Sequence, residues 1–204
     1  MTWIQTHSGL AFDLLKPKAD QIYTGDIVHA LARIARFTGH TKGDLPYSVA
    51  VHSVHAHLIA AKASPADYTA RLWALLHDAH EAYVGDISTP MKEALGFRKK
   101  DSPYDKMVRR IDLAIARHFG LTSAHLRDVE LIVKRCDFLA LQGERAAYMA
   151  KSTRPWKMDA KASAIRSAVE TPPACDPTDA ESLFSFYLQQ ALRRFRRSDV
   201  CRAA

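Results

Sequence analysis

The chain has 204 residues, of which 48% are hydrophobic, so it is long enough to bury a full core within one domain. The sequence contains no run of about 18 apolar residues, so we expect no membrane-spanning helix. The formal net charge is +7, but residues 193–202 alone hold five Arg and one Asp, which leaves the rest of the chain only mildly basic. This balance does not favour a general nucleic-acid-binding protein. The basic tail is typical of a solvated helix end, and contact between the tail and nucleic acid is the less favoured alternative.

Cysteine usage and the first residues predict the compartment. Cys136, Cys175 and Cys201 are widely spaced and odd in number, which favours a reducing environment over a disulfide framework, and no CxxC pair suggests a zinc finger. The start, MTWIQTHSGLAFDLL, lacks the basic-then-apolar build of a signal peptide. We therefore expect a cytoplasmic protein.

The elements predicted along the chain are nearly all helical. Residues 2–17 favour short strands weakly, whereas the later segments repeat apolar residues at helical spacing, with Ser48 and Ser102 as expected N-caps and Gly120 as an expected stop. The predicted helices span about 26–39, 48–63, 67–84, 103–119, 123–149 and 179–196. This pattern predicts an all-α bundle of about five to seven helices. Residues 1–150 would form the main domain, and 151–204 a C-terminal extension, with a final basic helix, packed on the same domain.

The segment LHDAHEAYVGD, residues 76–86, places charged side chains at the end of an apolar helix. Neighbouring residues on a helix diverge by about 100°, so His77 and Asp78 can share an ion only at the helix edge. Glu81 follows His77 by four residues and would stack on the same face. Imidazole with carboxylate is a ligand mixture that suits Mn²⁺, Fe²⁺, Co²⁺ or Zn²⁺ better than Ca²⁺.

Two further polar residues stand alone on apolar helical faces. His52 lies mid-helix, and Asp137 lies in VKRCDFLALQ, where an ionised carboxylate needs a partner. Each has an ordinary explanation, since His52 could be a hydrogen-bonded core histidine and Asp137 could pair with Lys134 or Arg135. Their joint order with His77 and Asp78, on three successive helices, favours a metal site.

That order resembles the H…HD…D signature of the HD-superfamily metal-dependent phosphohydrolases. HDAHEAYVGDISTPMK, residues 77–92, is similar to the HDxxExxxGDxPxPxK segment of bacterial HD-type 5′-nucleotidases, the YfbR group. RFTGHTKGDLPYSVAVHSV, residues 36–54, is similar to the RFxGH…YSVAxHxV block of the prophage-borne YfdR-like branch. The resemblance covers roughly residues 3–150.

The resemblance implies a role for each matching residue. It makes His52, His77, Asp78 and Asp137 the ligands of one divalent ion (Mn²⁺, Co²⁺, Fe²⁺ or Zn²⁺, with Mg²⁺ as a further candidate), and it makes Glu81 the group that acts with Asp78 on the attacking water. The residues assigned to the substrate are Arg36 for phosphate with Arg33 in reserve, His40 near the phosphate, Phe37 and Asp86 near the sugar, and Pro90 near the base. Phe37 replaces the Trp of the nucleotidase group, which leaves sugar selectivity open. His55 and His80 would be the residues to extend the site to a second metal, and a single ion is the favoured expectation.

The activity expected from this resemblance is hydrolysis of nucleotide phosphate esters. A 5′-nucleotidase releasing nucleoside and phosphate from (deoxy)nucleoside monophosphates is preferred. A (deoxy)nucleoside triphosphate triphosphohydrolase is the first alternative, and a non-catalytic nucleotide-sensing HD module is the second. A (p)ppGpp hydrolase is disfavoured, because Ala82 stands where those enzymes carry Asp after the Glu. The expected partners are the nucleotide and a second copy of the chain in a homodimer.

Overall fold

A computed structural model describes residues 2–97, 99, 101–156 and 169–203, with side chains as far as residue 198. The predicted all-α class is confirmed, since the described chain is mainly helical and carries only a small two-stranded ribbon. The elements in chain order are β1 (Trp3–Gln5), β2 (Ala11–Asp13), the 3₁₀ turn η1 (Ala19–Gln21), α1 (Thr24–Arg33), the 3₁₀ turn η2 (Arg36–Gly39), α2 (Val49–Ala63), α3 (Tyr68–Leu76), α4 (Glu81–Val84), α5 (Thr89–Ala94), α6 (Pro103–His118), α7 (Ser123–Tyr148) and α8 (Pro177–Ala203).

The predicted caps explain where several helices begin. The Ser48 hydroxyl accepts the backbone N–H of Val51 at 3.3 Å, and the Ser102 hydroxyl accepts that of Asp105 at 3.1 Å. Both bonds satisfy an N–H that has no partner within the first turn of a helix. The predicted strands also form, and Phe12 of β2 is buried against the ring of Tyr83 in α4, with 3.7 Å between the ring centroids. The ribbon thus supports α4 from outside.

The first predicted helix is shorter than its apolar spacing indicates. α1 ends at Arg33, and the chain turns extended at Ile34 and Ala35, where Ala35 forms an isolated bridge with Ser48. Phe37 and Thr38 in η2 both adopt φ of 55°, a conformation that is uncommon for non-glycine residues. Backbone hydrogen bonds to the start of α2 form here in place of the helical bonds that the apolar spacing predicts. They place Arg36 beside α2.

The third predicted helix is wrong as a continuous element. α3 ends at Leu76 and α4 begins at Glu81, and the turn between them is closed by tight bonds such as the Glu81 N–H to the Asp78 carbonyl at 2.9 Å. His77 and Asp78 therefore lie in a turn that follows a buried helix.

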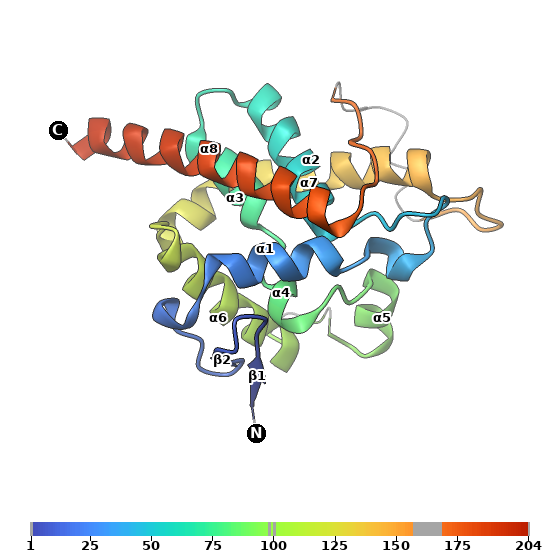
Figure 1. Cartoon of the computed structure of the whole chain (residues 1–204), viewed down its shortest axis with the longest axis horizontal. Coiled ribbons are helices and arrows are strands. Elements are labelled where there is room, and N and C mark those ends of the chain that lie inside the picture. Colours follow the sequence, from blue (N-terminus) through green and yellow to red (C-terminus); the bar gives the residue numbers. More distant parts are fainter. Residues whose placement is uncertain (1, 98, 100, 157–168, 204) are drawn as a thin grey trace.

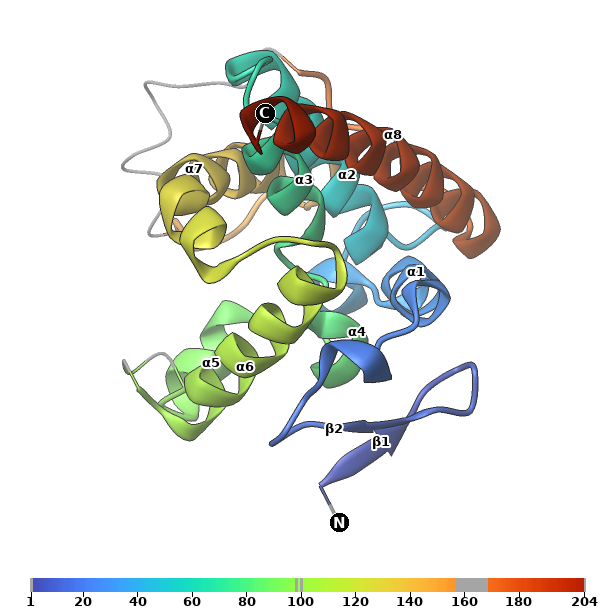
Figure 2. The ribbon, with the colours of Figure 1, turned by 90° about the vertical axis from the view of Figure 1, so that its left-hand side faces the viewer.

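The helix α2 is the centre of the molecule. It packs against α1, α3, α7 and α8, and most of its residues are buried. Figures 1 and 2 show α2, α3, α7 and α8 gathered in one half, with the ribbon, α5 and α6 in the other. The active-site candidates His52, His77 and Asp137 come from elements of the first half, where rigid packing can hold them.

The C-terminal helix α8 lies across α1, α2 and α3. It buries a row of apolar side chains against them: Ala180, Phe184, Leu188, Ala191 and Phe195. Arg193, Arg194, Arg196 and Arg197 are exposed on its outer side. Contact of this tail with nucleic acid stays a prediction; residues 157–168 of the expected extension, and side chains from residue 199 onward, lie outside the described part. Within that part, no helix is long and apolar enough to cross a membrane.

Candidate metal centre

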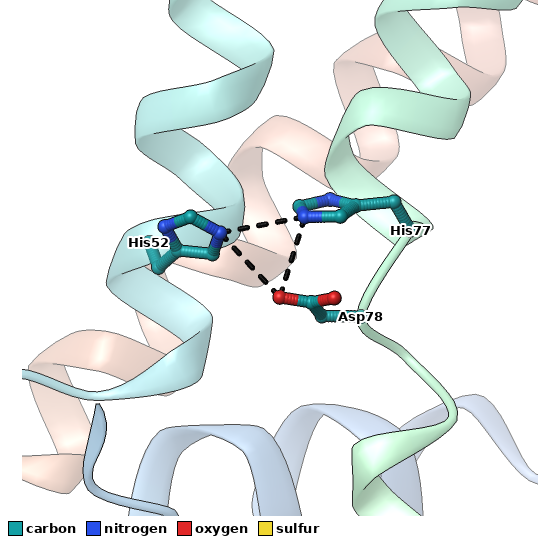
Figure 3. A group of neighbouring side chains, drawn as sticks. All are labelled: His52, His77 and Asp78. Carbon is teal, nitrogen blue, oxygen red and sulfur yellow. Dashed lines mark hydrogen bonds and ion pairs between the residues drawn. The ribbon is translucent and has the colours of Figure 1, made fainter. Parts of the chain in front are cut away.

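The four predicted ligands lie close together where three elements meet, and donor atoms of His52, His77 and Asp78 lie within 4.8 Å of one another. His52 projects from α2, His77 and Asp78 follow α3 (Figure 3), and Asp137 comes from α7. The Nε2 atom of His52 lies 3.4 Å from Nε2 of His77, 3.4 Å from Oδ2 of Asp78 and 3.2 Å from Oδ1 of Asp137. The Nε2 atom of His77 lies 3.3 Å from the same Asp78 oxygen and 3.8 Å from that of Asp137. We call these four residues the first donor group.

The outer nitrogen of each imidazole is already occupied. Nδ1 of His77 donates to the carbonyl of Ala74 at 2.8 Å, and Nδ1 of His52 donates to Oε1 of Glu144 at 2.7 Å. Because both partners only accept, the hydrogen of each neutral ring must sit on Nδ1. Each Nε2 then presents a lone pair to the other and to two carboxylate oxygens. Such a set fits a metal cation, and the outer bonds are those that typically orient metal-ligating histidines.

Glu144 is a site residue that the sequence reasoning missed. Its carboxylate is 0% exposed, accepts from Nε of Arg36 at 3.1 Å and lies 3.4 Å from Nδ1 of His55, in addition to its bond with His52. It follows Asp137 by seven residues, which is about two helical turns, so both lie on one face of α7. That spacing was the available signal. Glu144 connects His52, a predicted metal ligand, to the arginine expected to bind phosphate.

The charges around the first donor group favour bound cations. Burial opposes a charged His52, but the Glu144, Asp137 and Asp78 carboxylates outweigh it and raise the His52 pKa to about 10. Burial likewise opposes a charged His77, and Asp78 and Asp137 raise its pKa. The pKa values of Asp78 and Asp137 are lowered, against the effect of burial, by both histidines. A metal ion must displace these protons, so its binding will weaken as pH falls.

Glu81 lies beside the first donor group, but it does not stack on the face of His77 as predicted. The interruption between α3 and α4 removes the helical spacing that would stack it on His77, and its carboxylate groups instead with donor atoms of Asp78 and His80, all within 4.8 Å of one another. Its Oε2 is buried and has no hydrogen-bond partner. Burial, together with the Asp78 and Asp86 carboxylates, raises the Glu81 pKa to about 8. Such a carboxyl can exchange a proton near neutral pH.

Arg36 is the predicted phosphate ligand that the structure brings to the site. It is 11% exposed, and its Nη1 lies 3.5 Å from Oδ2 of Asp78. Arg33 is engaged elsewhere, since its guanidinium pairs with Glu181 of α8 and donates to the carbonyl of His29. The two arginines are separated by the turn that ends α1, so only Arg36 remains a candidate for the site.

The other predicted substrate residues lie at different distances from the centre. Phe37 is half-buried under the Arg36 guanidinium, whose carbon is 5.6 Å from the ring centroid. Asp86 is half-buried, and its pKa is raised because the effect of burial outweighs the lowering effect of the Arg36 charge. His40 and Pro90 are exposed, and Pro90 stands in the first turn of α5, where its fixed φ suits a helix start.

Two curated relatives place the chain in a family. An uncharacterized protein of Rhodobacter capsulatus is 37% identical over 148 residues, which is 71% of this chain and 73% of that protein. The uncharacterized protein YfdR of Escherichia coli K12 is 34% identical over 145 residues, which is 71% of each chain. The chain belongs to the YfdR family. No protein-family model matches it. Membership of the YfdR family assigns no activity, because both relatives are described as uncharacterized.

Proposed function

We propose that this YfdR-family protein is a metal-dependent phosphohydrolase of the HD superfamily that hydrolyses nucleotide phosphate esters. The observation that carries the proposal is the first donor group, in which each of two imidazole nitrogens lies 3.2–3.8 Å from one oxygen of Asp78 and one of Asp137 while both outer nitrogens are bonded. Two packed helices, α2 and α7, and the turn that follows α3 hold it, so its shape exists before any ligand arrives. That is the preorganisation a catalytic metal site requires.

His52, His77, Asp78 and Asp137 would hold one divalent ion, for which two imidazoles and two carboxylates favour Mn²⁺, Fe²⁺, Co²⁺ or Zn²⁺. When bound, the ion would acidify a coordinated water and neutralise charge that develops on the phosphoryl group. Glu144 fixes the ring of His52 and the guanidinium of Arg36 through one carboxylate. The metal ligand and the phosphate ligand are thereby positioned together.

Arg36 would bind the phosphate group, and Glu81 would act on the attacking water. The Arg36 guanidinium offers a planar fork of N–H donors that suits two phosphate oxygens, and its cost of burial is already met by Asp78 and Glu144. Glu81 would accept the proton of the attacking water at its free Oε2 or hold that water in line with phosphorus. Asp78 would act with Glu81 as a ligand that also orients this water.

The preferred substrates are (deoxy)nucleoside monophosphates, with nucleoside and phosphate as products. Phe37 beside Arg36 would contact the sugar, Asp86 would accept a hydrogen bond from a sugar hydroxyl, and Pro90 and His40 would lie at the outer edge of the substrate. Asp137 is 42% exposed, which supports access of a ligand to the centre from the α7 side.

The test is release of phosphate and of triphosphate from a panel of nucleotides with Mn²⁺, Co²⁺ or Mg²⁺. We expect the wild type to release phosphate from at least one monophosphate. Glu81→Gln should lower turnover by about 10²–10⁴-fold, because an amide cannot take the proton. Arg36→Gln should lower it by about 10²-fold through loss of charge on the phosphate.

Arg33→Gln is the matched control. It also removes a guanidinium, but one that lies three residues earlier and pairs with Glu181 of α8. It should keep turnover near that of the wild type. Release of triphosphate would mean that the protein is a triphosphohydrolase and not a monophosphatase. Absence of turnover on every nucleotide, with metal bound and the fold intact, would reject the enzyme and favour a nucleotide sensor.

A further inference from the structure

Trp156 lies beside Phe37, although it belongs to the segment that follows α7. The centroids of the two rings are 6.4 Å apart, and the ring planes are tilted by 55°. This separation is within the range that aromatic pairs prefer. The backbone N–H of Lys42, soon after η2, donates to the carbonyl of Tyr148 at 2.7 Å. That bond ties the end of α7 to the part of the chain that carries Phe37.

Each of the two rings also contacts an arginine. The guanidinium carbon of Arg36 lies 5.6 Å from the centroid of Phe37. That of Arg145 lies 4.4 Å from the centroid of Trp156, and both distances suit a cation–π contact. We call Arg36, Phe37, Trp156 and Arg145 the aromatic wall. The wall adjoins the first donor group, because Nη1 of Arg36 lies 3.5 Å from Oδ2 of Asp78.

The two rings of the aromatic wall are not part of the core. Trp73 on α3 is 7% exposed and packs in the core, whereas Phe37 and Trp156 are only half-buried. Residues 151–155 are all exposed, so Trp156 is the first side chain of this segment to return to the protein. Phe37 is held at φ of 55°, where a glycine would be unstrained, and strained residues of this kind cluster at ligand sites. Flat apolar surface therefore stays accessible beside the arginine expected to bind phosphate.

We propose that Trp156 determines specificity by stacking on the nucleobase of the substrate. The order of side chains along the aromatic wall matches the order of groups in a nucleotide, with Arg36 for the phosphate, Phe37 for the sugar and Trp156 for the base. Every base has a flat π face that can stack on an aromatic ring, so the wall favours nucleotides over sugar phosphates and discriminates weakly between bases. This inference deepens the proposed function and rests on it for the phosphate and the sugar.

The test compares adenosine 5′-monophosphate with ribose 5-phosphate, which has the same phosphate and sugar but no base. Binding to the full chain with Mn²⁺ is measured by isothermal titration calorimetry, and every sample carries Glu81→Gln so that little ligand is hydrolysed. We expect Trp156→Ala to bind the nucleotide about 5–100-fold more weakly, the usual loss for one stacked base. Its affinity for ribose 5-phosphate should not change. Trp156→Phe keeps a ring and should retain most of the affinity for the nucleotide.

Trp3→Ala is the matched control, since Trp3 is an exposed tryptophan on β1, and it should change neither affinity. A second measurement follows tryptophan fluorescence, which the nucleotide should quench in the parent protein and in Trp3→Ala but not in Trp156→Phe. It decides the matter even if Trp156→Ala does not fold, as checked by circular dichroism.

The outcomes separate this inference from the proposed function. Unchanged affinity for the nucleotide in folded Trp156→Ala, or equal weakening of both ligands, would overturn the stacking role. Phosphate release by the wild type would then still support the proposed hydrolysis. Weaker nucleotide binding in Trp156→Ala alone, without phosphate release by the wild type, would support stacking and reject the hydrolase.

Discussion

The first donor group and its neighbours Glu81, His80 and Asp112 differ in how their atoms are held. In the first donor group, His52 and His77 are fixed from behind by Glu144 and by the Ala74 carbonyl. Among the neighbours, Oε2 of Glu81 has no hydrogen-bond partner, and His80 forms an ion pair with Asp112, with 3.1 Å between Nδ1 and Oδ1. A ligand that is oriented in advance loses little freedom when an ion arrives. We therefore expect the first donor group to hold the ion and Glu81 to stay free to act on the attacking water.

This difference follows from the bonds that each residue makes and from the elements that carry it. His52 and Asp137 lie on α2 and α7, which pack against each other and against α3, while His77 and Asp78 lie in the turn after α3. His80 lies in the same turn, and Glu81 and Asp112 lie on the short helix α4 and the outer helix α6 (Figure 2). The core positions the residues on the long helices, and the Ala74 carbonyl orients His77 in the turn, whereas Oε2 of Glu81 has no such bond.

The largest effect is expected at Asp78, which would be a ligand of the proposed ion. Asp78→Ala removes a carboxylate from the first donor group, so the variant should lose its bound Mn²⁺, counted after equilibrium dialysis, and about a thousand-fold or more in turnover. Asp112→Asn leaves the first donor group complete and is the control, which should keep the bound Mn²⁺. Wild-type affinity for Mn²⁺ in folded Asp78→Ala would mean that Asp78 is not a ligand.

A smaller effect is expected from Glu144, which orients His52 but is not a proposed ligand. Glu144→Gln keeps the size of the side chain but removes the charge that holds His52 and Arg36, and loss of such an outer partner typically costs about 10–100-fold in metal affinity. The affinity for Mn²⁺ should fall by this factor in a titration of the metal-free protein. Glu130→Gln, on the exposed side of the same helix, is the control, and its affinity should stay at the wild-type value. Wild-type affinity in folded Glu144→Gln would mean that the charge of Glu144 does not support the first donor group.

The grouping of the four residues of the first donor group could be predicted because each of them breaks an apolar pattern. His52 and Asp137 are polar residues on otherwise buried helical faces, and His77 and Asp78 end a hydrophobic run, so each needs a partner. Glu144 escaped notice because its neighbours in QGERAAY are polar and small, and its burial depends on how α7 packs against α2. Only the spacing from Asp137 marks it.

The turns around the site could not be predicted from periodicity. The residues from 67 to 84 have a continuous helical pattern, yet the chain breaks after Leu76 so that both His77 and Asp78 can face the same point. Phe37 and Thr38 adopt positive φ although neither is glycine, and that turn brings Arg36 to the centre while leaving Arg33 outside. In both places tertiary contacts decide a conformation that local propensity does not favour.

A third histidine of α2 shows what happens without neighbouring carboxylates. His57 is buried, donates from Nδ1 to the Arg71 carbonyl at 2.8 Å, and has its pKa lowered to about 4 by burial and by the Arg71 charge. The unfolded chain binds this proton near pH 6.5, so between pH 6.5 and 4 it holds more protons than the folded chain. The stability due to neutral His57 is therefore complete above about pH 6.5 and is lost progressively as pH falls toward 4.

The smallest predicted effect tests this contrast with His52. Between pH 7.5 and 5.5, the free energy of unfolding of the metal-free wild type should fall by about 1 kcal/mol more than that of His57→Gln, as measured by urea denaturation. The difference between the two proteins removes the opposite contribution of His52 and His77, whose pKa values are raised and which therefore stabilise the fold as pH falls. His40→Gln, at an exposed position, should follow the wild type. Parallel pH curves for wild type and His57→Gln would mean that His57 keeps its ordinary pKa, and that burial in α2 alone does not distinguish it from His52.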